Sequence, residues 1–81
     1  MVIDIESEGE TLVVADSVET DGPADRAGIE SGDIFLEVGW EPVRNSDDFR
    51  REVRKTLSNR GSVVLRVRRG EERAFLAIRP H

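Results

Sequence analysis

Residues 23–43 read PADRAGIESGDIFLEVGWEPV, and this stretch is the most informative part of the chain. Gly28 and Gly32 bracket a short turn that holds one isoleucine, and the mostly apolar run 34–38 follows at once. Glycine permits the backbone conformations of a tight loop, and a short apolar run after a turn predicts a buried strand. Nothing in the stretch forms a catalytic group, so it favours a binding module over an enzyme.

Length and composition indicate one small domain. The chain has 81 residues and no cysteine. A domain of this size buries only about 60% of the surface of its unfolded chain, so the core is small and has no disulfide to reinforce it. The chain has no apolar run of about 18 residues, so no membrane span is predicted. The first residues also lack the pattern of a secretory signal. Because the chain starts abruptly at a strand, we expect residues 1–81 to be a single domain excised from a larger protein.

The net charge of −5 is distributed unevenly along the chain. Residues 1–33 contain ten acidic residues and one basic residue, a net charge of −9, whereas residues 34–81 carry a net charge of +4. One interpretation is a basic surface for an anionic ligand, and the other is a pair of solvated faces of opposite sign within one fold. The second is favoured because acidic residues are interspersed among the bases and few aromatic residues accompany them, so nucleic acid is not expected as a partner.

The hydrophobic pattern predicts a mostly β domain with some α structure. It is a five- to six-stranded antiparallel sandwich or partly open barrel, capped by one long helix at about 46–58 and one short helical turn at about 24–27. Strands are expected at residues 2–6, from 12 to about 18, 34–38, 63–68 and 74–78. Gly9 lies in the expected turn between the first two strands.

The long helix has recognisable ends. Ser46 is the expected N-cap, and acidic residues follow it in the first turn, where the helix dipole favours them. Phe49, Val53 and Leu57 recur at helical spacing and form the predicted buried stripe. Gly61 provides the stop signal at the C-terminal end.

The chain lacks the residues that most catalytic and metal sites require. His81 is the only histidine and there is no cysteine, so neither a histidine-based triad nor a zinc site is predicted. Glu6, Glu8 and Glu10 could bind calcium weakly, but their spacing matches no calcium loop and a solvated acidic turn is favoured. We therefore expect no catalytic residue, no metal ligand and no cofactor in this chain.

Trp40 is the one large aromatic residue outside a clear apolar pattern. It is either an exposed contact for a neighbouring domain or a ring that covers the edge of the small core. The second interpretation is favoured, because a small domain gains stability from any aromatic burial.

The stretch GPADRAGIESGDIFLEV, residues 22–38, resembles the signature Pro-Ala-x-x-Ala-Gly-hydrophobic-x-x-Gly-Asp-hydrophobic of PDZ domains. The downstream order EPV at 41–43, NSDDFR at 45–50 and VRRG at 67–70 is also similar. The resemblance covers roughly residues 12–79 and is strongest to the PDZ domains of bacterial HtrA/Deg-type serine proteases.

The resemblance implies a peptide-binding groove between one strand edge and the long helix. An extended peptide would add there as a further strand, with a pocket for its terminal side chain. In this family the carboxylate lies in a hydrophobic-Gly-hydrophobic loop before the groove strand, and Val2 stands here where that glycine would be. Phe49 and Leu57 would face inward. The residues implied to bind peptide are Val2, Ile3, Asp4 and Ile5 on the strand and Ser46, Arg50 and Val53 on the helix.

The implied partners are peptides or protein C-termini with apolar terminal residues, together with the domain of a parent serine protease. The implied location is the bacterial envelope or periplasm, with no insertion into the membrane. The alternative is a regulatory or assembly domain that has an incomplete carboxylate loop and does not bind peptide. PDZ domains of this branch also occur in site-2 metalloproteases, C-terminal processing peptidases and secretion components, so these parents stay open.

Overall fold

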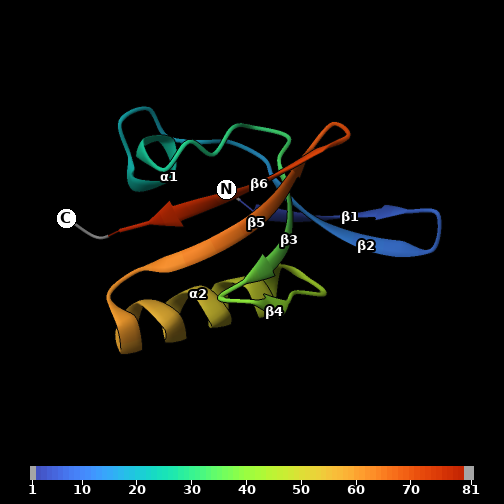
Figure 1. Cartoon of the computed structure of the whole chain (residues 1–81). Coiled ribbons are helices and arrows are strands. Elements are labelled where there is room, and N and C mark those ends of the chain that lie inside the picture. Colours follow the sequence, from blue (N-terminus) through green and yellow to red (C-terminus); the bar gives the residue numbers. More distant parts are fainter. Residues whose placement is uncertain (1, 80–81) are drawn as a thin grey trace.

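The computed structural model describes residues 2–79, which form one open, antiparallel sheet and two helices (Figure 1). The sheet order is β1-β2-β3-β5-β6, and β4 pairs with β3 to one side. The strands are β1 (Val2–Ser7), β2 (Glu10–Ala15), β3 (Ile34–Val38), β4 (Glu41–Pro42), β5 (Val63–Arg69) and β6 (Glu72–Ile78). The helices are α1 (Pro23–Arg26) and α2 (Ser46–Arg60). The predicted fold class is confirmed, with six strands in these residues and a sheet that does not close into a barrel.

Most of the expected boundaries differ from the structure by one to three residues, and two of the differences have a local cause. The second strand ends at Ala15 rather than near residue 18, and Ala15 forms its last backbone hydrogen bonds, to Gly32 and Asp33 in the loop before β3. The N-cap of α2 is Asn45 rather than Ser46, since the Asn45 side chain accepts a hydrogen bond of 2.8 Å from the Asp48 N–H. Helix α2 runs on to Arg60 and ends, as expected, at Gly61 in the left-handed conformation.

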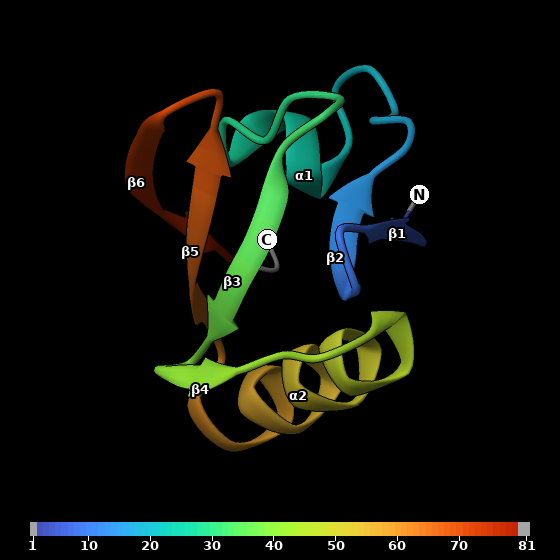
Figure 2. The same cartoon turned by 90° about the vertical axis from the view of Figure 1, so that its right-hand side faces the viewer.

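The core lies between the concave face of the sheet and α2 (Figure 2). Alternate residues of the central strands point inward, so that Val13, Phe35 and Val67 lie side by side across β2, β3 and β5 and are almost fully buried. From the first turns of α2, Phe49 places its ring 4.4 Å from the ring of Phe35, centroid to centroid. This pair joins the helix to the sheet.

One ion pair, between the buried Asp33 and the partly exposed Arg69, holds the loop before β3 against the end of β5. The Asp33 carboxylate is 1% exposed and accepts two hydrogen bonds of 2.8 Å from the Arg69 guanidinium. It also accepts a hydrogen bond from the Glu30 N–H, and Arg69 donates another to the Gly28 carbonyl. The hydrogen bonds from Arg69 lower the pKa of Asp33 although burial opposes this, and the Glu30 N–H contributes in the same direction as Arg69.

Replacing Arg69 by alanine is expected to destabilise the domain by about 3 kcal/mol, because it leaves the buried Asp33 carboxylate without its cation. Chemical denaturation of the unsubstituted domain and of the Arg69→Ala variant measures this difference in unfolding free energy. Arg73→Ala, at an exposed position on the neighbouring strand β6, is the control and should change stability by less than about 0.5 kcal/mol. Equal effects of the two substitutions would contradict the role given to Arg69.

The pH dependence of the unfolding free energy should reveal the contribution of the ion pair between Asp33 and Arg69. Because the pKa of Asp33 is lower in the folded state, the pair stabilises the fold above the carboxyl's unfolded-state pKa and loses this effect as pH falls through the folded-state value. Asp33→Asn removes the charge while keeping an acceptor for the Glu30 N–H. We expect Asp33→Asn to be less stable than the parent at pH 7, with the difference shrinking below about pH 4. A difference that stays constant down to pH 2 would contradict this assignment.

Candidate functional site

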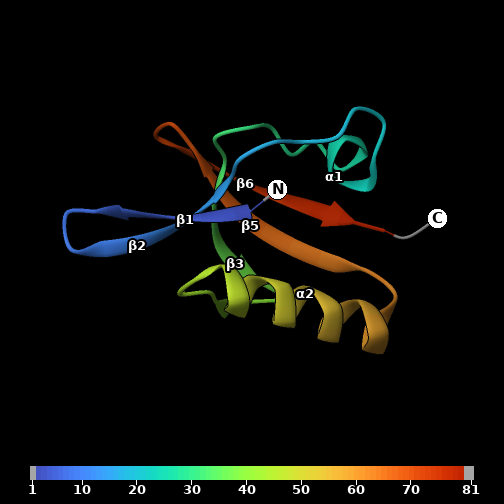
Figure 3. The same ribbon diagram turned by 180° about the vertical axis from the view of Figure 1, so that it is seen from behind.

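The candidate site lies between β1 and α2. Strand β1 is a terminal strand of the sheet and pairs only with β2 in the described residues 2–79, which leaves its other edge facing the helix (Figure 3). Such an edge presents backbone N–H and C=O groups to any further strand. Helix α2 begins beside this edge because Asn45 caps it there, and its first turns carry the three predicted helix residues of the site.

Asp4 ties the strand to the start of the helix. Its carboxylate accepts hydrogen bonds from the Ser46 N–H, at 2.7 Å, and from the Ser46 hydroxyl, at 3.2 Å. The first N–H groups of a helix have no partner within the helix and favour a negative charge. Asp4 therefore satisfies one of these groups from a strand that lies 42 positions earlier in the chain.

Arg50 forms a second bridge one turn further along α2. Its guanidinium donates a hydrogen bond of 3.1 Å to the backbone carbonyl of Val2. It also contacts the Ser46 hydroxyl and the Asp47 carboxylate, each at 3.3 Å, and its side chain is half exposed. The carbonyl that Arg50 occupies faces the helix, so it is an acceptor that an added strand would need.

An apolar cavity adjoins α2 beyond these bridges. Val53 lines an enclosed space of about 50 Å³ and a more open cleft of about 230 Å³ next to it. Ala24 and Ile78 border both spaces. The inner wall is completed by Ala15, Val18, Ile29 and the two core phenylalanines. The cleft is almost wholly apolar, so it suits an aliphatic or aromatic side chain rather than a charged group.

The structure therefore brings together most of the predicted site residues. Val2, Asp4, Ser46 and Arg50 form one hydrogen-bonded cluster, while Val53 lies at the adjoining cavity. Ile3 and Ile5 alternate with Asp4, so their side chains lie on the face of β1 away from α2 and are 38% and 42% exposed. These two residues can serve the groove only through their backbone.

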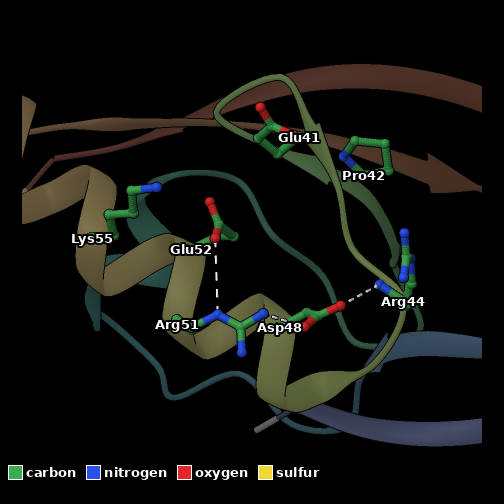
Figure 4. Close-up of a pocket in the computed structure, with 7 residues that line it drawn as sticks. All are labelled: Glu41, Pro42, Arg44, Asp48, Arg51, Glu52 and Lys55. Carbon is green, nitrogen blue, oxygen red and sulfur yellow. Dashed lines mark hydrogen bonds and ion pairs between the residues drawn. The ribbon is translucent and has the colours of Figure 1, made fainter.

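A larger hollow of about 450 Å³ lies on the other side of α2, toward β4 (Figure 4). Three basic and three acidic side chains line it together with a proline: Arg44, Arg51, Lys55, Glu41, Asp48, Glu52 and Pro42. The N–H of Arg44 and the side chain of Arg51 both donate to Asp48, and they lower its pKa in that order of effect. Since its charges balance and several pair with one another, this hollow shows no preference for a charged ligand.

The described residues contain neither a cluster of metal-binding side chains nor a membrane-spanning helix. Between Val2 and Arg79, no three acidic or histidine side chains come close enough to one another to hold a metal ion. Within the same range, no helix is long and apolar enough to cross a membrane. His81 lies outside the residues that the structure describes.

Comparison with known proteins identifies the family. Residues 14–69, more than half of the chain, match the PDZ domain family. The chain is a PDZ domain. It is 35% identical over 68 residues to the mitochondrial serine protease HTRA2 of Bos taurus, which covers 84% of this chain and 14% of that protein. It is 34% identical over 65 residues to the periplasmic serine endoprotease DegP of Salmonella typhimurium, which covers 79% of this chain and 13% of that protein.

A solved structure is similar as well. The crystal structure of the HtrA3 PDZ domain bound to a phage-derived ligand, FGRWV, superposes with a TM-score of 0.71 and 26% identity, and the match covers 86% of this chain and 60% of that one. The predicted resemblance to the PDZ domains of HtrA/Deg-type proteases is thus confirmed. The chain spans about a seventh of the length of the curated relatives just named.

Sequence reasoning missed two residues that border the apolar cleft. Ala24 and Ile78 border the apolar cleft, and the alternation of residues 74–78 could have placed Ile78 on the inner face. The capping role of Asn45 was assigned to its neighbour, although both residue types are good N-caps. The contact between Asp4 and Ser46 had no signal in the sequence, because it joins two distant segments.

Removing the Asp4 carboxylate should loosen the junction between β1 and α2. Asp4→Ala leaves the Ser46 N–H without its acceptor, so we expect a loss of about 1 kcal/mol in unfolding free energy. We also expect faster amide hydrogen exchange in β1 and in the first turn of α2. The control is Glu10→Ala, an exposed acidic position on the same hairpin. If amide exchange at the start of α2 were unchanged in Asp4→Ala, the bridge would not stabilise this junction.

Proposed function

We propose that this PDZ domain binds extended peptide segments by strand addition in the groove between β1 and α2. The observation that carries the proposal is an unpaired strand edge lying beside the helix, with an apolar cleft at Val53 next to it. Main-chain hydrogen bonds to β1 would supply affinity, and the cleft would select an apolar side chain. The HtrA3 PDZ domain that this fold resembles is bound to a peptide ligand, which supports the proposal.

We assign the apolar end of the ligand to the cleft at Val53, Ala24 and Ile78. The open part of this cleft measures about 230 Å³, large enough for one aliphatic or aromatic side chain. Glu19 is the one ionisable residue that lines it, and the wall is otherwise apolar, so a negatively charged terminal side chain would lose its hydration without compensation. The preferred ligands are therefore peptides or protein C-termini that end in an apolar residue.

We assign to Arg50 the role of binding the terminal carboxylate of the peptide ligand. When a peptide adds to β1, its N–H groups can take over the Val2 carbonyl that Arg50 now occupies. The released guanidinium then lies at the side of the groove and is free to bind the terminal carboxylate. A charge-assisted hydrogen bond of this kind contributes about 1.5–3 kcal/mol. The exchange favours binding only for ligands that carry the carboxylate.

We further propose that the domain belongs to a longer serine protease of HtrA/Deg type in the bacterial envelope, where it would recognise substrates or regulate the attached protease. The similarity to HTRA2 and to the periplasmic DegP supports this assignment. The apolar C-termini of damaged or unfolded proteins are ligands of the required chemistry.

A second candidate function rests on the two bridges. Asp4 with Ser46 and Arg50 with Val2 join the strand to the helix across the groove. If a peptide cannot displace them, the domain acts as a regulatory or assembly module that does not bind peptide. Amide chemical-shift titration with a set of short apolar peptides separates the two. Shifts at residues 2–5 and 46–53 support peptide binding, and a silent spectrum over the whole set supports the closed module.

Arg50→Ala should change ligand preference rather than abolish the groove. We expect peptides with a free carboxylate to bind the variant about tenfold more weakly, because the cation is lost. The same peptides with a C-terminal amide should bind the variant as well as they bind the parent, or better, because the Val2 carbonyl no longer has a competitor.

The matched control is Arg54→Ala, an exposed arginine one turn further along α2. Calorimetric titration with the free and amidated forms of one peptide measures all of these affinities. If Arg50→Ala weakened both forms equally, or neither, Arg50 would not contact the carboxylate.

A further inference from the structure

Trp40 occupies an unfavourable backbone conformation at the tip of the turn between β3 and β4. Its φ is 72°, in the left-handed region that glycine adopts readily and that residues with a large side chain avoid. The preceding Gly39 also has a positive φ, of 56°. A tryptophan at this position is not required by the turn, for which glycine would be the less strained choice.

The Trp40 side chain is displayed and not buried. It is 64% exposed, so the expectation that its ring covers the edge of the core is wrong. Its only aromatic neighbour among the described residues is Phe75 of β6, which is itself 60% exposed and lies with its ring centroid 5.5 Å away. Two large rings therefore form an apolar platform on the outside of the sheet.

Three arginines share the outer face of the sheet with this platform. The Arg66 guanidinium lies 5.9 Å from the centre of the Phe75 ring and is held in place by Glu37, at 3.2 Å. Arg66 is paired with Phe75 across β5 and β6, and Arg68 with Arg73, so all four side chains lie on the outer face, opposite the buried Leu65 and Val67. The surface thus carries three arginines and one glutamate on a chain whose net charge is −5.

We propose that this aromatic–arginine patch, formed by Trp40, Phe75, Arg66, Arg68 and Arg73, is a second docking site, which takes an acidic protein segment with a large apolar side chain. Tryptophan and arginine are the residues most enriched at the energetic centres of protein interfaces. Exposed rings can receive an apolar side chain, while the arginines pair with flanking carboxylates.

Charge favours a short protein segment over a membrane. At physiological salt, charges are screened beyond about 8 Å, so a segment on the patch senses mainly the local arginines. A broad anionic membrane would also meet the field of the remaining acidic residues of a chain whose net charge is −5, so it would be attracted less than a short segment. The patch faces away from the β1–α2 groove, so the two sites can be tested separately.

The probe is a blocked hexapeptide, acetyl-EDLFDE-amide. Its C-terminal amide replaces the terminal carboxylate, which is the group that we expect the β1–α2 groove to bind. Trp40 is the only tryptophan and there is no tyrosine, so the fluorescence change reports directly on the patch. We expect a saturable change in emission with a Kd below about 1 mM, weakened by added salt. The charge-reversed peptide acetyl-KRLFRK-amide should give no response.

Two variants test the assignment against a purely structural role. Trp40→Gly should fold with a melting temperature within about 4 °C of the parent, because glycine suits the positive φ, and amide chemical shifts should show at least tenfold weaker binding of the acidic peptide. Phe75→Thr, a good strand former on an exposed position, should weaken binding in the same way. Ile5→Thr on the outer face of β1 and Arg54→Ala at an exposed position of α2 are the controls and should bind the acidic peptide like the unsubstituted domain.

Several outcomes would overturn the proposal. They are the absence of any response to the acidic peptide up to several millimolar, equal responses to both peptides, and unchanged affinity in Trp40→Gly. Association of the chain with itself through Trp40, seen as concentration-dependent sedimentation that Trp40→Gly removes, would assign the patch to a second copy instead. Binding to phosphatidylglycerol vesicles in preference to the peptide would assign it to a membrane surface.

Discussion

The ion pair between the buried Asp33 and the partly exposed Arg69 is the interaction on which the arrangement of the sheet depends. The carboxylate lies just before β3, and the guanidinium comes from the last residue of β5. The same loop is bound to the end of β2 by backbone hydrogen bonds between Ala15 and residues 32–33, at 2.8 and 2.9 Å. Three strands are therefore held at one point. A charge with almost no exposure to water is stable there only because each carboxylate oxygen has a donor.

Some of the residues that stabilise the fold also line the apolar cavity beside the groove. Ala15, Ile29 and Phe35 belong to the segments that this pair holds, and all three line the apolar cavity next to Val53. The wall of the cleft is thus part of the core, and its shape depends on the same packing that stabilises the fold. The polar half of the groove is different, since Asp4 and Arg50 reach it from partly exposed positions and can exchange partners without disturbing the core.

Much of this domain could be predicted from local patterns. The run 34–38 is a strand with the expected bounds. The helix predicted at about 46–58 is found at Ser46–Arg60, with the expected stop at Gly61. The residues Val2, Asp4, Ser46 and Arg50 were grouped through resemblance to a family, and they do lie together. The exposure of Trp40 could not be predicted, because a lone aromatic residue in a turn carries no periodicity to show which way it points. The partners of Asp33 and Asp4 could not be predicted either, because each joins segments that are more than 30 residues apart.

The sequence by itself determined the approximate positions of the helices and strands and the family, because these follow from residue types and their spacing over a few turns or strands. It also showed that the chain has no cysteine and only one histidine, His81. Only the tertiary structure decided which charges meet, which strand edge faces the helix, and that Arg50 occupies the Val2 carbonyl. It also decided that the rings of Trp40 and Phe75 meet on the outside of the sheet. Hydrogen bonds and ring contacts act over a few ångströms, so contacts between distant segments exist only once the chain has folded.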